Sequence, residues 1–159
     1  MSDGAEIVQE PATAPGPLGN LGALGERMGL RLLEASADRA VGSLPVEGNT
    51  QPYGILHGGA SCVLAEQLGS IAAMLHAGPG KVAMGVELNA SHHRAVATGH
   101  ITGVATAISR GGTLASYEIL ISDDDGRRVC TARLTCVIRD DRGAGAGDQS
   151  GRTTAGSSE

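Results

Sequence analysis

The sequence has almost no aromatic residues. Its 159 residues include no Phe, no Trp and two Tyr, Tyr53 and Tyr117. Proteins that hold single-stranded nucleic acid stack bases on aromatic rings, and this chain offers no such platform. A net charge of −5 further disfavours nucleic acid as a partner. The core is therefore expected to consist of Val, Ile, Leu, Ala and Met.

Cysteine is scarce, and the sequence lacks motifs for metals, membranes and nucleotides. The three cysteines, Cys62, Cys130 and Cys136, are an odd number without a CxxC spacing or a secretory signal. This pattern predicts free thiols in a reducing compartment and hence a cytoplasmic protein. No His–Cys spacing suggests zinc, no apolar run approaches a membrane span, and Gly111-Gly112 is too short for a phosphate loop. We expect no cofactor and no membrane partner.

The two ends of the chain differ in composition from its middle. Residues 1–17 are rich in Ala, Pro, Gly and Glu, and residues 140–159 are rich in Gly, Ser, Thr and Arg. Neither segment shows hydrophobic periodicity, which predicts a disordered leader and a disordered tail. Residues 18–139 remain, and they are sufficient for one domain with its own core.

Hydrophobic patterning in residues 18–139 predicts one long helix among strands. A short helix is expected near residues 18–26, and strands at 28–35 and 39–46, joined by a hairpin, precede a helix at 60–76. Four strands follow, at residues 81–93, 100–109, 113–122 and 129–138, and we expect them to form an antiparallel meander. A single helix among about six antiparallel strands is buried best when the sheet wraps around it. The predicted fold class is therefore α+β, a curved antiparallel sheet around one central helix.

The segment 51–76 carries the candidate chemistry. It reads Q-P-Y-G-I-L-H-G-G-A-S-C-V-L-A-E-Q-L-G-S-I-A-A-M-L-H. His57 and the pair Gly58-Gly59 precede the predicted helix, so their backbone amides lie where a helix leaves N–H groups unpaired. Such amides can stabilise an oxyanion.

The predicted helix has two different faces. Leu64, Leu68, Ile71 and Leu75 form an apolar stripe, whereas Glu66 lies on the opposite side. The residues around Glu66 are small, which favours close contact with another surface over exposure to solvent. Two interpretations of Glu66 remain open on this evidence, a solvated helix residue and a functional acid. His57 likewise suits either a turn or a site.

Three stretches resemble the hotdog-fold acyl-CoA thioesterases. They are Q-P-Y-G-I-L-H-G-G-A-S-C-V-L-A-E-Q-L-G-S at 51–70, G-V-E-L-N-A-S-H at 85–92 and D-G-R-R-V-C-T-A-R-L-T at 125–135. The resemblance covers residues 28–139 and points to the branch of 4-hydroxybenzoyl-CoA and phenylacetate-pathway thioesterases. Within it, the chain is most similar to the 1,4-dihydroxy-2-naphthoyl-CoA thioesterases of menaquinone synthesis and their enterobactin-pathway relatives. It implies hydrolysis of an acyl-CoA, with an aromatic acyl group, to the free acid and CoA.

The resemblance also implies catalytic roles. Glu66 would act as the nucleophile or as the general base, and sequence does not decide between the two. The N–H of Gly58 would polarise the thioester carbonyl. Gln51 and His57 would assist near the carbonyl and the leaving thiolate, and Ser70 would help to place water or substrate.

Substrate binding and assembly follow from the same resemblance. His92 matches an acyl-pocket histidine, while Arg94 and the turn with Arg110, Gly112 and Thr113 would contact CoA. Both arginines could instead be solvated surface charges. The resemblance implies a homodimer or homotetramer in which each active site takes its acid from one chain and its oxyanion donor from another.

Several alternatives compete with the thioesterase interpretation. Met74 replaces an aromatic residue of the nearest relatives, which leaves the acyl group open. A dehydratase of the same fold would place its acid and base differently, and a non-catalytic acyl-CoA-binding module would lack the helix acid. A metal site from His57, Glu66, His92 and His93 is disfavoured, because adjacent residues of a strand point to opposite sides.

Overall fold

The computed structural model describes residues 21–141, which form two helices and six strands. The elements, in chain order, are α1 (Gly22–Met28), β1 (Arg31–Ala35), β2 (Arg39–Pro45), α2 (Gly58–Ala77), β3 (Lys81–His92), β4 (His100–Arg110), β5 (Leu114–Asp123) and β6 (Arg128–Asp140). The predicted leader, residues 1–17, and residues 142–159 of the predicted tail lie outside the described part. The tail boundary at residue 140 is slightly wrong, because β6 continues through Asp140.

The six strands form one antiparallel sheet in the order β1-β2-β4-β5-β6-β3. The predicted hairpin between the first two strands is confirmed. The predicted four-stranded meander is only partly correct, because β4, β5 and β6 form a meander whereas β3 pairs with β6 at the sheet edge. The chain must therefore cross the sheet between β3 and β4, because β4 pairs with β2 and β5 and not with β3.

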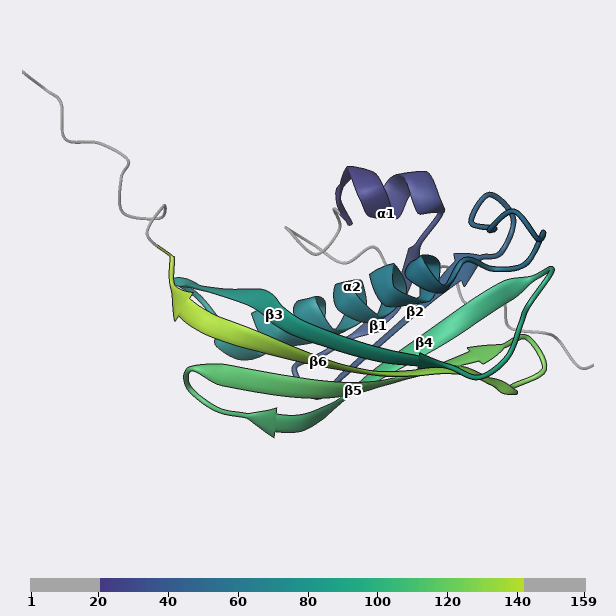
Figure 1. Ribbon diagram of the computed structural model, residues 1–159. Helices are drawn as coiled ribbons and strands as arrows, with labels where there is room; N and C mark the ends of the chain where they lie inside the picture. Colours follow the sequence, from purple (N-terminus) through teal and green to yellow (C-terminus); the bar gives the residue numbers. More distant parts are fainter. Residues whose placement is uncertain (1–20, 142–159) are drawn as a thin grey trace, which may run out of the picture.

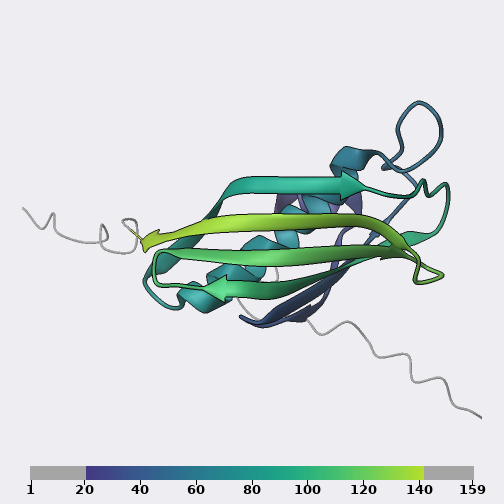
Figure 2. The same cartoon turned by 60° about the horizontal axis from the view of Figure 1, so that its bottom comes forward.

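Helix α2 lies along the curved sheet, and α1 lies on the other side of α2 (Figures 1 and 2). Leu64 and Leu68 of α2 are fully buried. Glycines on two neighbouring strands make room for Leu68, because a Cβ added at Gly42 or Gly103 would lie 2.9 or 2.8 Å from its methyl groups. The predicted fold, a sheet wrapped around one central helix, is confirmed.

The small residues near Glu66 on α2 are in close contact with the chain's own sheet. Gly69 and Ala73 are buried within the chain itself, and a Cβ at Gly69 would lie 2.6 Å from Leu134 of β6. A second subunit is thus not needed to explain these two residues. They allow the sheet to approach the helix closely.

Helix α2 begins earlier than predicted. Gly58 and Gly59 are its first two residues, whereas the sequence suggested a flexible glycine turn before a helix at residue 60. The side chain of His57 provides the reason, because it accepts a hydrogen bond from the Gly59 amide and so caps the helix. At the other end, Gly78 (φ 74°) terminates α2.

By length and composition, α2 could cross a membrane, contrary to the prediction from the sequence. It has 20 residues, and its most apolar 18-residue window has a mean hydropathy of 1.2. Half of that window is buried inside the domain. We interpret α2 as the core helix that the sheet surrounds, since core helices have the same composition as membrane spans.

Candidate active site

The first turn of α2 presents an unpaired backbone amide. The Gly59 amide donates to Nδ1 of His57 at 2.8 Å, and the Ala60 amide donates to the His57 carbonyl at 2.9 Å. The Gly58 amide has no acceptor within residues 21–141. Because helix N-termini favour negative charge, this amide is suited to an oxyanion.

The cap also defines the protonation of His57. In a neutral imidazole one nitrogen accepts and the other carries the proton. Since Nδ1 accepts from the Gly59 amide, Nε2 carries the proton and is free to donate. His57 is exposed, so its Nε2–H can reach a bound molecule at the helix start.

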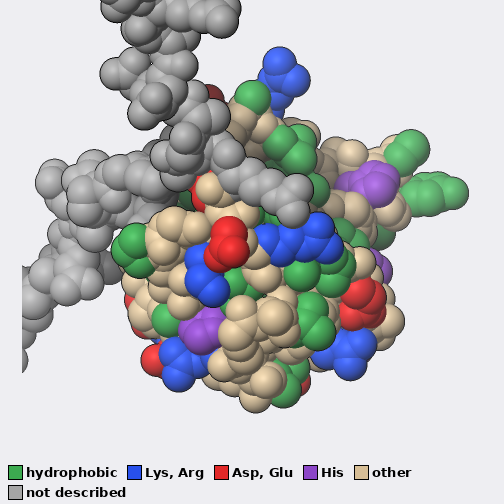
Figure 3. Space-filling view, turned by 90° about the vertical axis from the view of Figure 1, so that its left-hand side faces the viewer, with side chains coloured by type: hydrophobic (Ala, Val, Ile, Leu, Met, Phe, Trp, Pro, Cys, Tyr) green, Lys and Arg blue, Asp and Glu red, His purple; other side chains and the backbone are tan. Residues whose placement is uncertain are grey.

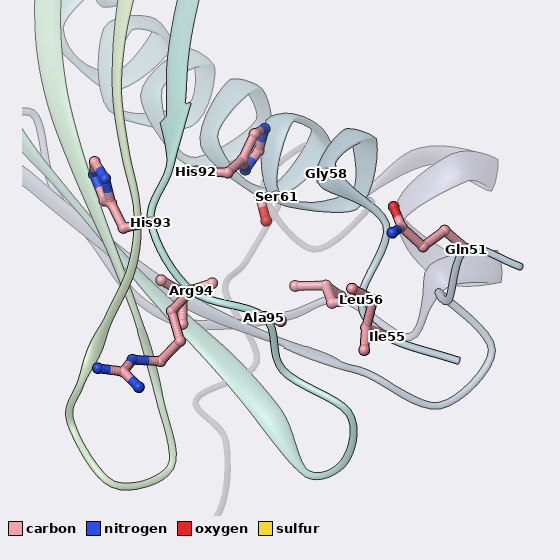
Figure 4. A pocket seen from close by; sticks show the side chains of 10 residues that line it. Gln51, Ile55, Leu56, Gly58, Ser61, His92, His93, Arg94 and Ala95 are labelled. Atoms are coloured by element: carbon pink, nitrogen blue, oxygen red, sulfur yellow. The ribbon is translucent and has the colours of Figure 1, made fainter. Parts of the chain in front are cut away.

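His92 lies beside this first turn. A Cβ added at Gly58 would be 3.0 Å from Nε2 of His92, so glycine is needed for the ring to approach the backbone. The neighbouring His93 points to the other side of the strand (Figure 4), where its Nε2 lies 3.0 Å from Oγ1 of Thr131. Figure 4 shows the two rings on opposite sides of the strand end, as the alternation predicted.

A pocket of about 380 Å³ opens at this end of the molecule. Its lining comes from the loop before α2, the first turns of α2, the end of β3 with the segment after it, and β6: Gln51, Ile55, Leu56, Gly58, Ser61, His92, His93, Arg94, Ala95 and Val129. Figure 4 shows Gln51 across the pocket from His92, with Gly58 between them, and the Arg94 guanidinium turned away. Four predicted site residues, Gln51, Gly58, His92 and Arg94, therefore line this pocket.

Ser61 is a pocket residue that the sequence did not single out. It is 1% exposed and lies one turn into α2. A serine in a helix gives no periodic signal that separates it from its apolar neighbours. Only the packing of His92 and Leu56 around it identifies it as part of the lining.

Glu66 lies further along α2 in a separate groove. Its side chain is half-buried, and loss of solvation raises the pKa of the carboxyl, while a hydrogen bond from Ser70 opposes this rise. The carboxylate packs directly on the backbone of β3 at Gly85. A Cβ at this position would clash with Oε1 of Glu66. The structure thus places Ser70 and Gly85 next to the Glu66 carboxylate.

Gly85 is the clearest residue that sequence reasoning missed. It lies at a β-bulge, since the register between β3 and β6 shifts between Gly85 and Glu87. Glycine inside a strand often marks a close approach of another group. That signal was present in the sequence, although nothing in it named Glu66 as the approaching group.

We expect Gly85→Ala to displace the Glu66 carboxylate without unfolding the domain. The new methyl group would collide with the end of a flexible side chain, which can rotate away at little cost. Turnover should fall by about 10²-fold, as for other losses of a positioned base. Thermal unfolding and turnover measured on the same preparation check this. Unchanged turnover in Gly85→Ala would contradict the placement of Glu66.

Glu66 and Gly58 cannot serve one substrate carbonyl within a single chain. Glu66 follows Gly58 by eight positions along helix α2, which corresponds to about 12 Å along the axis. An oxyanion donor and a nucleophile both act at roughly 3 Å from the reacting carbonyl group. Within one chain, these two predicted groups therefore lie too far apart to act on the same carbonyl.

The remaining predicted residues lie at the opposite end of the sheet. Arg110, Gly112 and Thr113 belong to the β4–β5 turn, where the Gly111 carbonyl lies 3.0 Å from Nε2 of His76 at the end of α2. The length of β4 separates this turn from Arg94 by about 30 Å. Figure 3 shows basic side chains mixed with acidic ones at this end, and Arg110 itself pairs with Asp38 at 2.8 Å.

The arginines differ in their freedom to bind an anion. Arg94 is exposed and forms no ion pair with any residue between 21 and 141, whereas Arg110 is already paired. In the part of the chain that the structure describes, no three His, Cys, Asp or Glu side chains gather as metal ligands would. The thiols of Cys62, Cys130 and Cys136 are free.

The chain is similar to known proteins in both sequence and structure. The family model described as "Thioesterase superfamily" matches residues 53–130. The proofreading thioesterase EntH of Cronobacter turicensis is 42% identical over 120 residues, which is 75% of this chain and 88% of the relative.

Solved structures give the same result. A thioesterase from Haemophilus influenzae has a TM-score of 0.71 at 33% identity, with 74% of this chain and 82% of that chain covered. A variant of a thioesterase from Pseudomonas aeruginosa has a TM-score of 0.71 at 39% identity, with 74% and 86% covered. With its sheet wrapped around a helix that carries an acid, this chain belongs to the thioesterase superfamily and has the hotdog fold.

Proposed function

We propose that this chain hydrolyses an acyl-CoA thioester to the free acid and CoA, with Glu66 as nucleophile or general base and the Gly58 N–H as oxyanion donor. One observation carries the proposal. In a thioesterase-superfamily domain, the core helix presents a half-buried carboxylate with a raised pKa, seated on a glycine. An ordinary helical glutamate would be solvated instead.

The chemistry suits these groups. Hydrolysis needs an oxygen nucleophile and stabilisation of the tetrahedral oxyanion, while a thiolate leaves without much need of a proton. A positioned base contributes roughly 10²–10⁴ in rate, and one oxyanion donor contributes about 3 kcal/mol. Desolvation raises the pKa of Glu66, which makes its ionised form a stronger base at neutral pH.

We infer that a second copy of the chain completes the site. Strand β3 has 12 residues and pairs with β6 on one side only, so its other edge offers unpaired backbone groups among the described residues. Met84 and Val86 of β3 are 48% and 59% exposed. Neighbouring exposed apolar side chains on an edge strand are typical of a surface that binds another protein. Pairing between two β3 strands would satisfy this edge.

Such pairing would bring the two halves of the site together. In an antiparallel pair related by a two-fold axis, the His92 end of one strand runs toward the Lys81 end of the other. His92 packs against Gly58, so the helix start of a second copy would travel with it toward Glu66, which lies against Gly85 in the middle of β3. Dimers of this kind, or tetramers built from them, are our proposed functional form.

We propose an aromatic acyl group, such as 1,4-dihydroxy-2-naphthoyl or hydroxybenzoyl, on the strength of the sequence resemblance. For CoA, Arg94 is our first candidate contact, because its guanidinium has no competing ion pair within residues 21–141. Arg110, Gly112 and Thr113 remain proposed contacts from the opposite end. In a dimer, one chain could supply Arg94 and the other chain the turn with Arg110, Gly112 and Thr113.

A panel of acyl-CoA thioesters tests the proposed function. We expect release of free thiol from aryl-CoA substrates well above the uncatalysed rate, and slower release from long-chain acyl-CoA. Background rates across the panel, together with saturable binding of the same thioesters, would instead support a non-catalytic acyl-CoA-binding module. Single-turnover hydrolysis in heavy-oxygen water then distinguishes the two roles of Glu66, because direct water attack labels the acid in the first turnover.

A further inference from the structure

A second groove, separate from the pocket at the start of α2, lies on the outer face of that helix. Its volume is about 290 Å³, and it is lined by Leu24, Cys62, Val63, Glu66, Gln67 and Leu88. Hydrocarbon and a thiol make up most of this lining, so the groove is suited to apolar matter. Glu66 is its only carboxylate among the lining residues.

Helix α1 forms one wall of this groove. Figure 1 shows α1 on the side of α2 that faces away from the sheet. The end of α1 is fixed, because Nδ2 of Asn49 donates to the Met28 carbonyl at 2.8 Å and to the Pro45 carbonyl at 2.9 Å. Gly29 (φ 73°) then turns the chain into β1.

Leu24 lies one turn before this anchored end and points into the groove. It is 59% exposed, although Met28 on the same helix packs against the core. An exposed leucine is ordinary by itself. This one, however, borders the same space as the Glu66 carboxylate.

We propose that Leu24 determines acyl specificity by forming the outer wall of a groove that receives the acyl carbons beside Glu66. The inference rests on the proposed function and names the acyl side of that site. A thioester whose carbonyl carbon meets Glu66 must place its first acyl carbons within a few bond lengths of the carboxylate. Leu24, Val63 and Leu88 supply the apolar surface there, while the polyanionic CoA moiety would be poorly matched to this lining.

Because Leu24 lies on a short helix outside the sheet, substitutions at this position can change the width of the groove. Helix α1 has 7 residues and packs against α2 rather than within the sheet. A larger side chain at position 24 would narrow the groove, and a smaller one would widen it. Neither change disturbs the buried core, because the side chain is mostly exposed.

The test compares Leu24→Trp and Leu24→Ala with wild type on acetyl-CoA, benzoyl-CoA and dodecanoyl-CoA. Leu24→Trp should lower kcat/KM for the two larger substrates relative to acetyl-CoA by about tenfold or more, and Leu24→Ala should raise the relative value for dodecanoyl-CoA. Leu33→Trp is the matched control, since Leu33 is 47% exposed on β1 at the other edge of the sheet.

Each outcome decides the proposal. Shifted substrate ratios in the Leu24 variants, with wild-type ratios in Leu33→Trp, support it. Unchanged ratios in an active wild-type background overturn the role of Leu24 and leave the thioesterase assignment intact. A wild-type protein that hydrolyses none of the three substrates overturns both, and circular dichroism of each variant separates these results from misfolding.

Discussion

Glu66→Ala should lower acyl-CoA turnover by at least about 10²-fold, because it removes the group that attacks the thioester or activates water. The domain should stay folded, since the Glu66 side chain is only half-buried. Glu66→Gln is the sharper form of the same test. It keeps the shape that rests on Gly85 and the hydrogen bond with Ser70, yet it can neither attack nor take up a proton.

The control for these variants is Glu118→Gln. Glu118 is an exposed carboxylate on β5, far from the groove, and the change in charge is identical. We expect wild-type turnover from it. Should Glu66→Gln keep more than a few per cent of wild-type turnover while it remains folded, Glu66 would not be the catalytic acid.

Gly58→Pro should lower turnover by about 10²-fold, equivalent to about 3 kcal/mol, with little effect on folding. Proline removes only the N–H at this position, which is the proposed oxyanion donor. The backbone tolerates proline here for two reasons. Gly58 is the first residue of α2, where proline is favoured, and His57 already has the extended conformation (φ −69°, ψ 131°) that precedes proline.

Gly58→Ala is the matched control, because it adds the same Cβ beside His92 and keeps the N–H. Any loss shared by both variants reports the displacement of His92. The additional loss in Gly58→Pro reports the amide itself. Equal turnover in the two variants would mean that the Gly58 amide does not stabilise the oxyanion.

The element order of this fold is readable from the sequence, whereas its sheet order is not. Alternating apolar residues predict strands, but a period of two names no partner. The four strands after α2 were thus expected to form one meander, and β3 instead lies at the edge, next to β6. This misplacement is important for function, because the free edge of β3 is the surface that we propose for the second copy.

For helix α2, the sequence likewise predicted one feature correctly and another wrongly. Its apolar stripe was correctly predicted, since Leu64 and Leu68 face the core. Its start was wrong by two residues because the capping hydrogen bond from Gly59 to His57 depends on a ring orientation that the sequence does not specify. The same cap, however, fixes the tautomer of His57, and the Gly58 amide next to it has no acceptor among residues 21–141.

The candidate site residues were found by motif, and their spatial relations came only from the structure. The resemblance named both Glu66 and Gly58, yet the helix holds them about 12 Å apart. Gly85 and Leu24 had no motif at all, because each acts through a contact between distant segments of the chain. Contacts of this kind become visible only when the strands and helices are assembled.

Mixing two inactive variants tests the central claim most directly. In a dimer with shared sites, one Glu66→Ala chain and one Gly58→Pro chain together form one intact site and one doubly altered site. Random assembly gives mixed dimers in about half of the population, so turnover should recover to about one quarter of wild type. Refolding the two variants together after denaturation ensures that their chains exchange. If the mixture stays as inactive as either variant alone while mixed dimers are present, each site lies within a single chain, and the shared-site account is wrong.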